Sequence, residues 1–298
     1  MEWIFLALLA PALWAIMNIT DKWILTNYFK GAFSYQVLTV MTDVLIIPIL
    51  FLLAPISFDP SLFVPALILG MISGFSFVIY NKAMLVEEAS RVISLMYMTP
   101  LFILPMAIVF LGEVLTPVKY AGIALLVVSA ILISYRKVLG KHKFLSTGMI
   151  LILIWGVIWA GYQVATKWML GSVDVWSFTL WTLVGTFISG MLLTLIPKVR
   201  KEFISDVKRS KAAVYAIRVT TSMLYLVAML SFYFAISAAP ISIVGAMPSV
   251  QPVFVLLYVL LFSAFLPKIL REENTRNTII LKALAVILIF IGTWAITA

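Results

Sequence analysis

The chain has 298 residues, of which 64% are hydrophobic and only 11% are charged. An ordinary soluble domain is about 45–50% apolar and about 25% charged, so this composition excludes a soluble globule and predicts a protein that lies in lipid. The net charge of +9 fits loops that meet anionic lipid head groups, and we expect no nucleic-acid partner.

A membrane-spanning helix needs about 20 mostly apolar residues, and ten stretches of the chain meet this condition. The first has no basic flank before it, so we interpret it as a span and not as a cleavable signal peptide. The expected fold class is therefore an all-α polytopic membrane protein with ten transmembrane helices. The predicted spans are residues 3–20, 33–54, 62–84, 91–112, 117–135, 147–168, 175–196, 212–237, 241–266 and 277–297.

Two segments about half a chain apart resemble each other. Residues 14–25 read WAIMNITDKWIL, and residues 159–170 read WAGYQVATKWML. Two tryptophans, an alanine, a lysine and a leucine coincide, and the side-chain amide of Asn18 aligns with that of Gln163. So many matches in a short window indicate an internal duplication.

Each copy of the duplicated unit holds five predicted spans. An odd number makes the second copy enter the membrane from the opposite side, so we expect residues 1–138 and 139–298 to form inverted repeats within one membrane domain. Two such halves can rock about a central site and expose it alternately, which is typical of transporters. The alternative is a duplication without alternating access, as in some channels or scaffolds.

Basic residues are distributed unevenly between the two sets of connectors. Sixteen lysines and arginines lie in the connectors that follow the odd-numbered spans, against Lys119 alone in the other connectors and the termini. Cytoplasmic loops carry an excess of such residues. We therefore expect both termini to face the outside.

Several motifs resemble those of one transporter family. They are the tryptophan and lysine that open each half, Pro-Leu-Phe at 100–102, and FLGEVLTPVKYAGIALLV at 110–127. Together they resemble the EamA-type transporters of the drug/metabolite transporter superfamily. The resemblance implies a secondary transporter, often an exporter of amino acids or other small metabolites, with a cavity lined by the first four spans of each half. The second half departs from the pattern, because LFSAFLPKILREE at 261–273 lacks a Gly-Glu turn.

Asp43 lies near the centre of the second span. A charged group at mid-bilayer costs about 2.5–3.5 kcal/mol on insertion scales, so a functional role is the default hypothesis. We expect Asp43, as the only acid deep inside a span, to couple transport to protons or to hold a substrate amine. The alternative is a protonated carboxyl that bonds a neighbouring helix. Lys82 is a candidate partner of Asp43, although snorkelling to the interface also explains it.

Other polar and aromatic side chains lie inside the predicted spans. An amide in a membrane must find a partner, either another helix or a ligand, so we expect Asn18 and Gln163 to approach one central cavity from opposite halves. Aromatic faces with a few polar groups are the usual composition of a small-molecule pocket. The further candidates for substrate binding are Trp14, Tyr80, Tyr97, Trp159, Tyr162 and Gln251.

The expected function is secondary active transport of a small metabolite by alternating access, as an exporter or exchanger. A channel or receptor is the alternative. An intramembrane enzyme is disfavoured, because cysteine is absent, the single histidine (His142) is in a loop, and no metalloprotease or Walker motif occurs. We expect no metal and no cofactor, a monomer or homodimer, and a location in a prokaryotic inner membrane.

Overall fold

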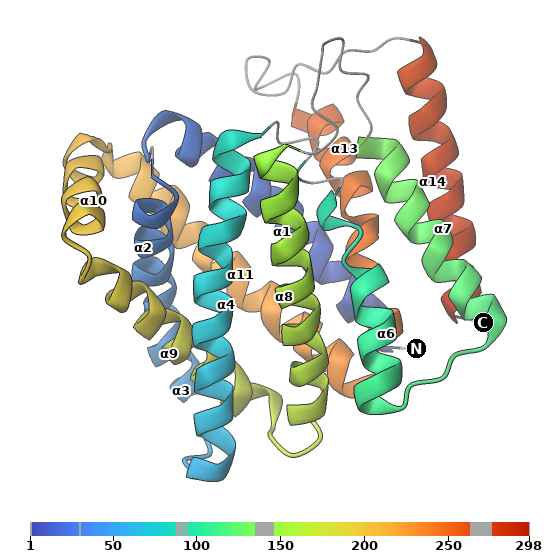
Figure 1. Ribbon diagram of the computed structural model, residues 1–298, viewed down its shortest axis with the longest axis horizontal. Coiled ribbons are helices and arrows are strands. Elements are labelled where there is room, and N and C mark those ends of the chain that lie inside the picture. The colour runs from blue at the N-terminus through green and yellow to red at the C-terminus, as the bar shows by residue number, and fades with distance from the viewer. Residues whose placement is uncertain are drawn as a thin grey trace.

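The computed structural model describes residues 2–29, 31–87, 92, 95–134, 146–262 and 276–297 (Figure 1). The expected division between residues 138 and 139 lies outside these ranges. The helices are α1 (Glu2–Asn27), α2 (Ala32–Asp43), η1 (Val44–Ile46), α3 (Ile47–Leu53), α4 (Pro60–Val86), α6 (Pro100–Leu111), α7 (Pro117–Ser134), α8 (Thr147–Met169), α9 (Val175–Thr194), α10 (Pro197–Arg209), α11 (Ala212–Ala238), α12 (Ile241–Val244), η2 (Met247–Val250), α13 (Gln251–Phe262) and α14 (Arg276–Thr297).

Six of the described helical segments are long and apolar enough to cross a membrane. They are α1, the run from α2 through α3, α4, α8, α9 and α11. Shorter apolar helices occupy the other four predicted spans: α6, α7, the stretch from α12 into α13, and α14. The described residues therefore form an all-helical polytopic membrane protein, whereas the count of ten spans and the inverted repeat remain predictions.

Local sequence sets several helix ends. Asp59, Ser146 and Asp174 each accept a hydrogen bond from a backbone N–H two or three residues later, at the start of α4, α8 and α9. These caps satisfy donors that a helix leaves free at its first turn. Gly112 ends α6 with φ of +65°, a conformation that glycine adopts without the steric cost of a side chain.

The central helices pack in two similar groups. In one, α1 contacts α11 and α13, and in the other, α8 contacts α4 and α6. The helices α7 and α14 pack on each other at one edge of the molecule (Figure 1). The centre is thus built from α1, α4, α8 and α11, which come from both halves of the chain.

Two lysines tie helices together at corresponding places. Lys22 Nζ on α1 donates to the carbonyl of Met84 near the end of α4, at 2.9 Å. Lys167 Nζ on α8 donates to the carbonyl of Ile236 near the end of α11, at 2.7 Å. Each ammonium group compensates carbonyls that a helix C-terminus leaves without a partner. The two lysines occupy matching positions in the duplicated segments.

The segment 197–211, which the sequence suggests is a plain connector, contains the amphipathic helix α10. Val199 is buried, and Phe203 and Val207 contact neighbouring hydrophobic clusters from the same face. Asp206 is also buried and accepts a hydrogen bond from Ser34 Oγ on α2, at 2.8 Å. The helix is therefore docked on the start of α2.

The glutamate of the FLGE motif joins the two halves. Glu113 accepts hydrogen bonds from the backbone N–H groups of Ile241 and Ser242, at 2.7 and 2.9 Å, and from Ser242 Oγ at 2.7 Å. It therefore caps the start of α12, which is on the other half of the chain.

Candidate functional site

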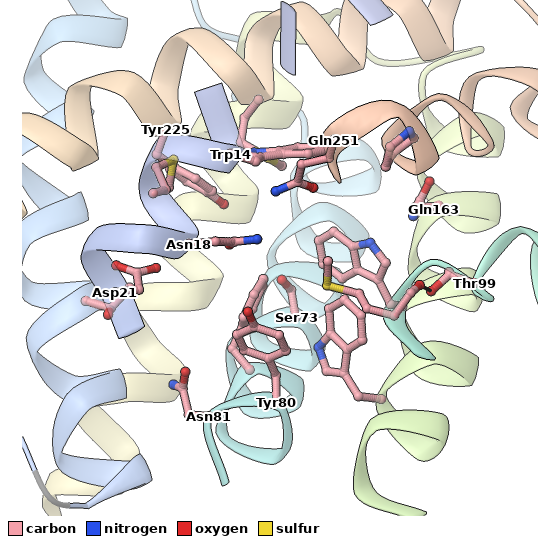
Figure 2. Close-up of a pocket in the computed structure, with 18 of the residues that line it drawn as sticks. Trp14, Asn18, Asp21, Ser73, Tyr80, Asn81, Thr99, Gln163, Tyr225 and Gln251 are labelled. Carbon is pink, nitrogen blue, oxygen red and sulfur yellow. Dashed lines mark hydrogen bonds between the residues drawn. The ribbon is translucent and has the colours of Figure 1, made fainter. Parts of the chain in front are cut away.

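A cavity of about 150 Å³ lies among the central helices (Figure 2). A cavity of this size in another protein binds a molecule as large as benzene. Both halves of the chain contribute to its wall. The lining residues are Trp14, Met17, Asn18, Asp21, Tyr35, Gln36, Thr39, Asp43, Ser73, Phe77, Tyr80, Asn81, Met96, Tyr97, Thr99, Pro100, Trp155, Trp159, Gln163, Thr186, Arg218, Tyr225, Met229, Gly245, Pro248, Ser249 and Gln251.

Most of the side chains selected from the sequence line this cavity. Asn18 and Gln163 both do so, from α1 and α8, as expected. The others that line it are Trp14, Asp43, Tyr80, Tyr97, Trp159 and Gln251.

Two of the selected side chains are placed elsewhere. Tyr162 is not part of the lining: it is buried, and its hydroxyl hydrogen-bonds that of Tyr233 on α11 at 2.5 Å. Lys82 is exposed, in accord with snorkelling, and the partner of Asp43 is instead Arg218.

An ionic network forms one side of the cavity. Arg218 on α11 donates from Nη2 to Asp43 Oδ1 at 2.9 Å, and Ser222 Oγ donates to the same oxygen at 2.6 Å. Arg218 Nη1 lies 3.7 Å from Asp21 Oδ1 on α1, which accepts a hydrogen bond from the hydroxyl of Tyr35 at 2.5 Å. One guanidinium therefore faces two carboxylates.

Asp21 and Arg218, the two charged members of this network besides Asp43, were not selected from the sequence. The expectation that Asp43 is the only acid deep inside a span is wrong, because α1 continues to Asn27 and Asp21 lies within it, on the cavity wall. Trp14, Asn18 and Asp21 follow helical spacing, which is the signal that could have identified the aspartate. Arg218 could have been identified by its position well inside the predicted span 212–237, where a charged side chain is unusual.

Aromatic rings form another side of the cavity. Trp155 and Trp159 on α8 stack with ring centroids 5.5 Å apart. Phe77 on α4 meets Trp159 edge to face at 5.4 Å, and Tyr80 is tilted against Trp155 at 5.4 Å. A ligand here would meet apolar faces on one side and charged or amide groups on the other.

Buried polar atoms without a hydrogen-bond partner in the protein are concentrated around the cavity. Among the described residues there are seven such side-chain atoms, and every one of them belongs to a residue that lines the cavity. A native interior satisfies nearly all its buried polar groups, through protein, water or ligand. The atoms are Thr39 Oγ1, Tyr97 OH, Trp155 Nε1, Gln163 Oε1, Arg218 Nε, Ser249 Oγ and Gln251 Nε2.

The part of the chain that is described shows no metal-binding geometry at the cavity. Within those ranges no three histidine, cysteine, aspartate or glutamate side chains come together as metal ligands would. The amides of Asn81 and Gln36 bond each other at 3.1 Å on the wall.

Comparison with known proteins gives a family match and a fold match. Residues 1–135 match the model of the EamA-like transporter family. No curated protein sequence matches the chain. A crystal structure described only as that of a protein aligns with a TM-score of 0.72 and 15% identity, covering 98% of this chain and 96% of the other. At that identity the similarity shows the fold alone.

Proposed function

We propose that the chain, whose residues 1–135 match the EamA-like transporter family, is a secondary active transporter, an exporter or exchanger of a small metabolite such as an amino acid. Alternating access is the mechanism. The observation that carries the proposal is the concentration of unsatisfied buried polar atoms around one cavity.

Those atoms and the aromatic rings together define the ligand's chemistry. Unpaired polar atoms in a low-dielectric interior cost free energy, which a ligand recovers when it supplies hydrogen bonds. The rings of Trp155 and Trp159 offer apolar contact beside them. The substrate is therefore a compact molecule with polar groups at its ends and some apolar surface between them.

Alternating access is supported by the relation between the halves. The contacts of α1 with α11 and α13 have their counterpart in those of α8 with α4 and α6. The bonds of Lys22 to Met84 and of Lys167 to Ile236 are also counterparts. Two inverted repeats around a shared cavity can close one face while the other opens.

Binding and transport are tested together with purified protein. A thermal-shift screen against a metabolite library should identify a ligand that raises the unfolding temperature, because a ligand that binds only the folded state stabilises it. Liposomes loaded with that ligand should then take up its labelled form faster than empty liposomes. A hit whose flux shows neither saturation nor this acceleration would contradict the transporter proposal and favour a channel.

A pair of tryptophans on one helix tests whether the cavity is the binding site. Trp159→Ala should weaken binding of the screened ligand by about tenfold to a hundredfold, since contact with a large apolar side chain contributes roughly 1.5–3 kcal/mol. Trp168 is on α8 but outside the cavity and 69% exposed, so Trp168→Ala should retain the affinity. Equal loss in both variants would place the ligand elsewhere.

We further propose that the protein lies in a prokaryotic inner membrane with both termini outside. Ser205 on α10 and Ser61 at the start of α4 are both exposed, and the chain has no cysteine. In intact cells, an impermeant thiol reagent should therefore label Ser61→Cys and spare Ser205→Cys until the membrane is permeabilised. Labelling of Ser205→Cys in intact cells would show that the proposed orientation is wrong.

A further inference from the structure

The charges where α1, α2 and α11 meet do not balance. Arginine keeps its positive charge in proteins, so Arg218 contributes one positive charge against the two carboxyls of Asp21 and Asp43. An uncompensated charge in a poorly solvated interior is costly. One further positive charge, a proton or a cationic group, would make the network neutral.

The two aspartates are held in different ways. Asp43 Oδ1 receives hydrogen bonds from both Arg218 and Ser222, and only 7% of the Asp43 side chain is exposed. The Asp21 carboxyl stands 3.7 Å from the guanidinium, beyond hydrogen-bond length, and its side chain is 26% exposed. Arg218 therefore compensates Asp43 closely, and the remaining negative charge falls on Asp21, which lines the cavity.

We infer that Asp21, and not Asp43, is the carboxyl that takes up and releases the proton which drives transport. Asp43 is a positioning residue that fixes the guanidinium of Arg218. The unpartnered Nε of Arg218 belongs to the same cavity wall, so this corner of the wall is built to receive a ligand. The inference deepens the proposed transport function and rests on it for its physiological meaning.

The proton balance of the step is simple. With the cavity open to one side, water delivers a proton to an oxygen of Asp21, and an O–H bond forms. When the cavity opens to the other side, that bond breaks and the proton returns to water, so the network changes from neutral to one negative charge. The titratable groups that line the cavity together with Asp21 are Arg218 and Tyr225 from α11, Tyr35 and Asp43 from α2, Tyr80 from α4, and Tyr97.

Infrared difference spectroscopy tests the assignment without a known substrate. Wild-type protein in liposomes is titrated with acid, and the C=O stretch of protonated carboxyls is recorded. One band of the wild type should be lost in Asp21→Asn and retained in Asp43→Asn. If no band is lost in Asp21→Asn, or if a band is lost in Asp43→Asn and kept in Asp21→Asn, the inference is overturned.

Tyr35→Phe gives a second readout should Asp21→Asn fail to fold. This variant keeps the Asp21 carboxyl and removes the phenol that donates to it. The band should remain and move to higher frequency, because a carboxyl that loses a hydrogen bond has a stiffer C=O bond. An unmoved band would overturn the assignment to Asp21. The spectroscopic experiments measure no transport. A negative result in them would therefore overturn the assignment to Asp21, while the liposome exchange assay tests the proposed transport function separately.

Discussion

Replacing Arg218 with methionine should lower the free energy of unfolding by about 3–5 kcal/mol, because it removes one partner of a buried ion pair and leaves the carboxylates uncompensated. Arg218 is 1% exposed and is the cation that faces both Asp43 and Asp21. Methionine has similar length and no charge, so the loss measures the ion pairs more than the packing. Unfolding in detergent micelles, followed by circular dichroism, gives the difference.

Lys82→Met is the matched control for this variant. Lys82 also lies within an apolar helix, α4, but its side chain is exposed. Removing an exposed charge that holds no buried partner should change stability by no more than about 0.5 kcal/mol. If Arg218→Met changed the free energy of unfolding as little as Lys82→Met, the ionic network would not stabilise the fold.

Neutralising the whole network provides the complementary test of the same idea. In Arg218→Met combined with Asp21→Asn and Asp43→Asn, no charge of the network stays buried without a partner. A buried ion pair is often replaceable by neutral groups at little cost. The triple variant should therefore recover much of the stability that the single substitution loses.

The cavity wall was largely predictable from the sequence because the bilayer makes polarity informative. A side-chain amide inside a span must face protein, water or a ligand, so Asn18, Gln163 and Gln251 indicated the cavity before any contact was known. Tyr162 has the same kind of sequence signal, yet it bonds Tyr233. Polarity within a span shows that a group has a partner but not which partner.

The ionic network was not predictable in the same way. Arg218 and Asp43 are 175 positions apart in the chain, and only the packing of α11 beside α2 brings them together. The count of basic residues that assigns the orientation uses only the connectors and the termini. It therefore gives no role to Arg218, which lies inside a predicted span. Asp21 was assigned to a connector because the sequence pattern does not fix a helix end to within a few residues.

The second large change in stability is expected where α4 and α9 pack closely against each other. Gly70 and Gly74 on α4 face Thr182 and Ser189 on α9, and Gly185 on α9 faces Leu67 on α4. Small residues four apart let two membrane helices approach until their backbones touch. The same two helices carry Ser73 and Thr186 on the cavity wall, so this contact also sets the width of the cavity there.

Gly70→Ala and Gly185→Ala should each lower the free energy of unfolding by at least about 1–3 kcal/mol, the usual cost of overpacking a filled interior. A methyl group at Gly70 would collide with the backbone carbonyl of Thr182, whose carbon lies 2.8 Å from the added atom. At Gly185 it would collide with the carbonyl of Leu67, whose carbon lies 2.9 Å away. Backbone cannot rotate aside as a side chain does, so the helices must separate.

Gly161→Ala is the control that separates steric collision from helix propensity. Gly161 is inside α8, and a methyl group built there meets no atom within 4 Å. Alanine is favoured over glycine in a helix by about 0.8–1.0 kcal/mol, so this variant should unfold at the wild-type temperature or slightly above it. The three variants are compared by thermal unfolding in one detergent. Equal stability of Gly70→Ala, Gly185→Ala and Gly161→Ala would mean that α4 and α9 do not approach through backbone contact, and the cavity wall between them would then have to be wider than this packing allows.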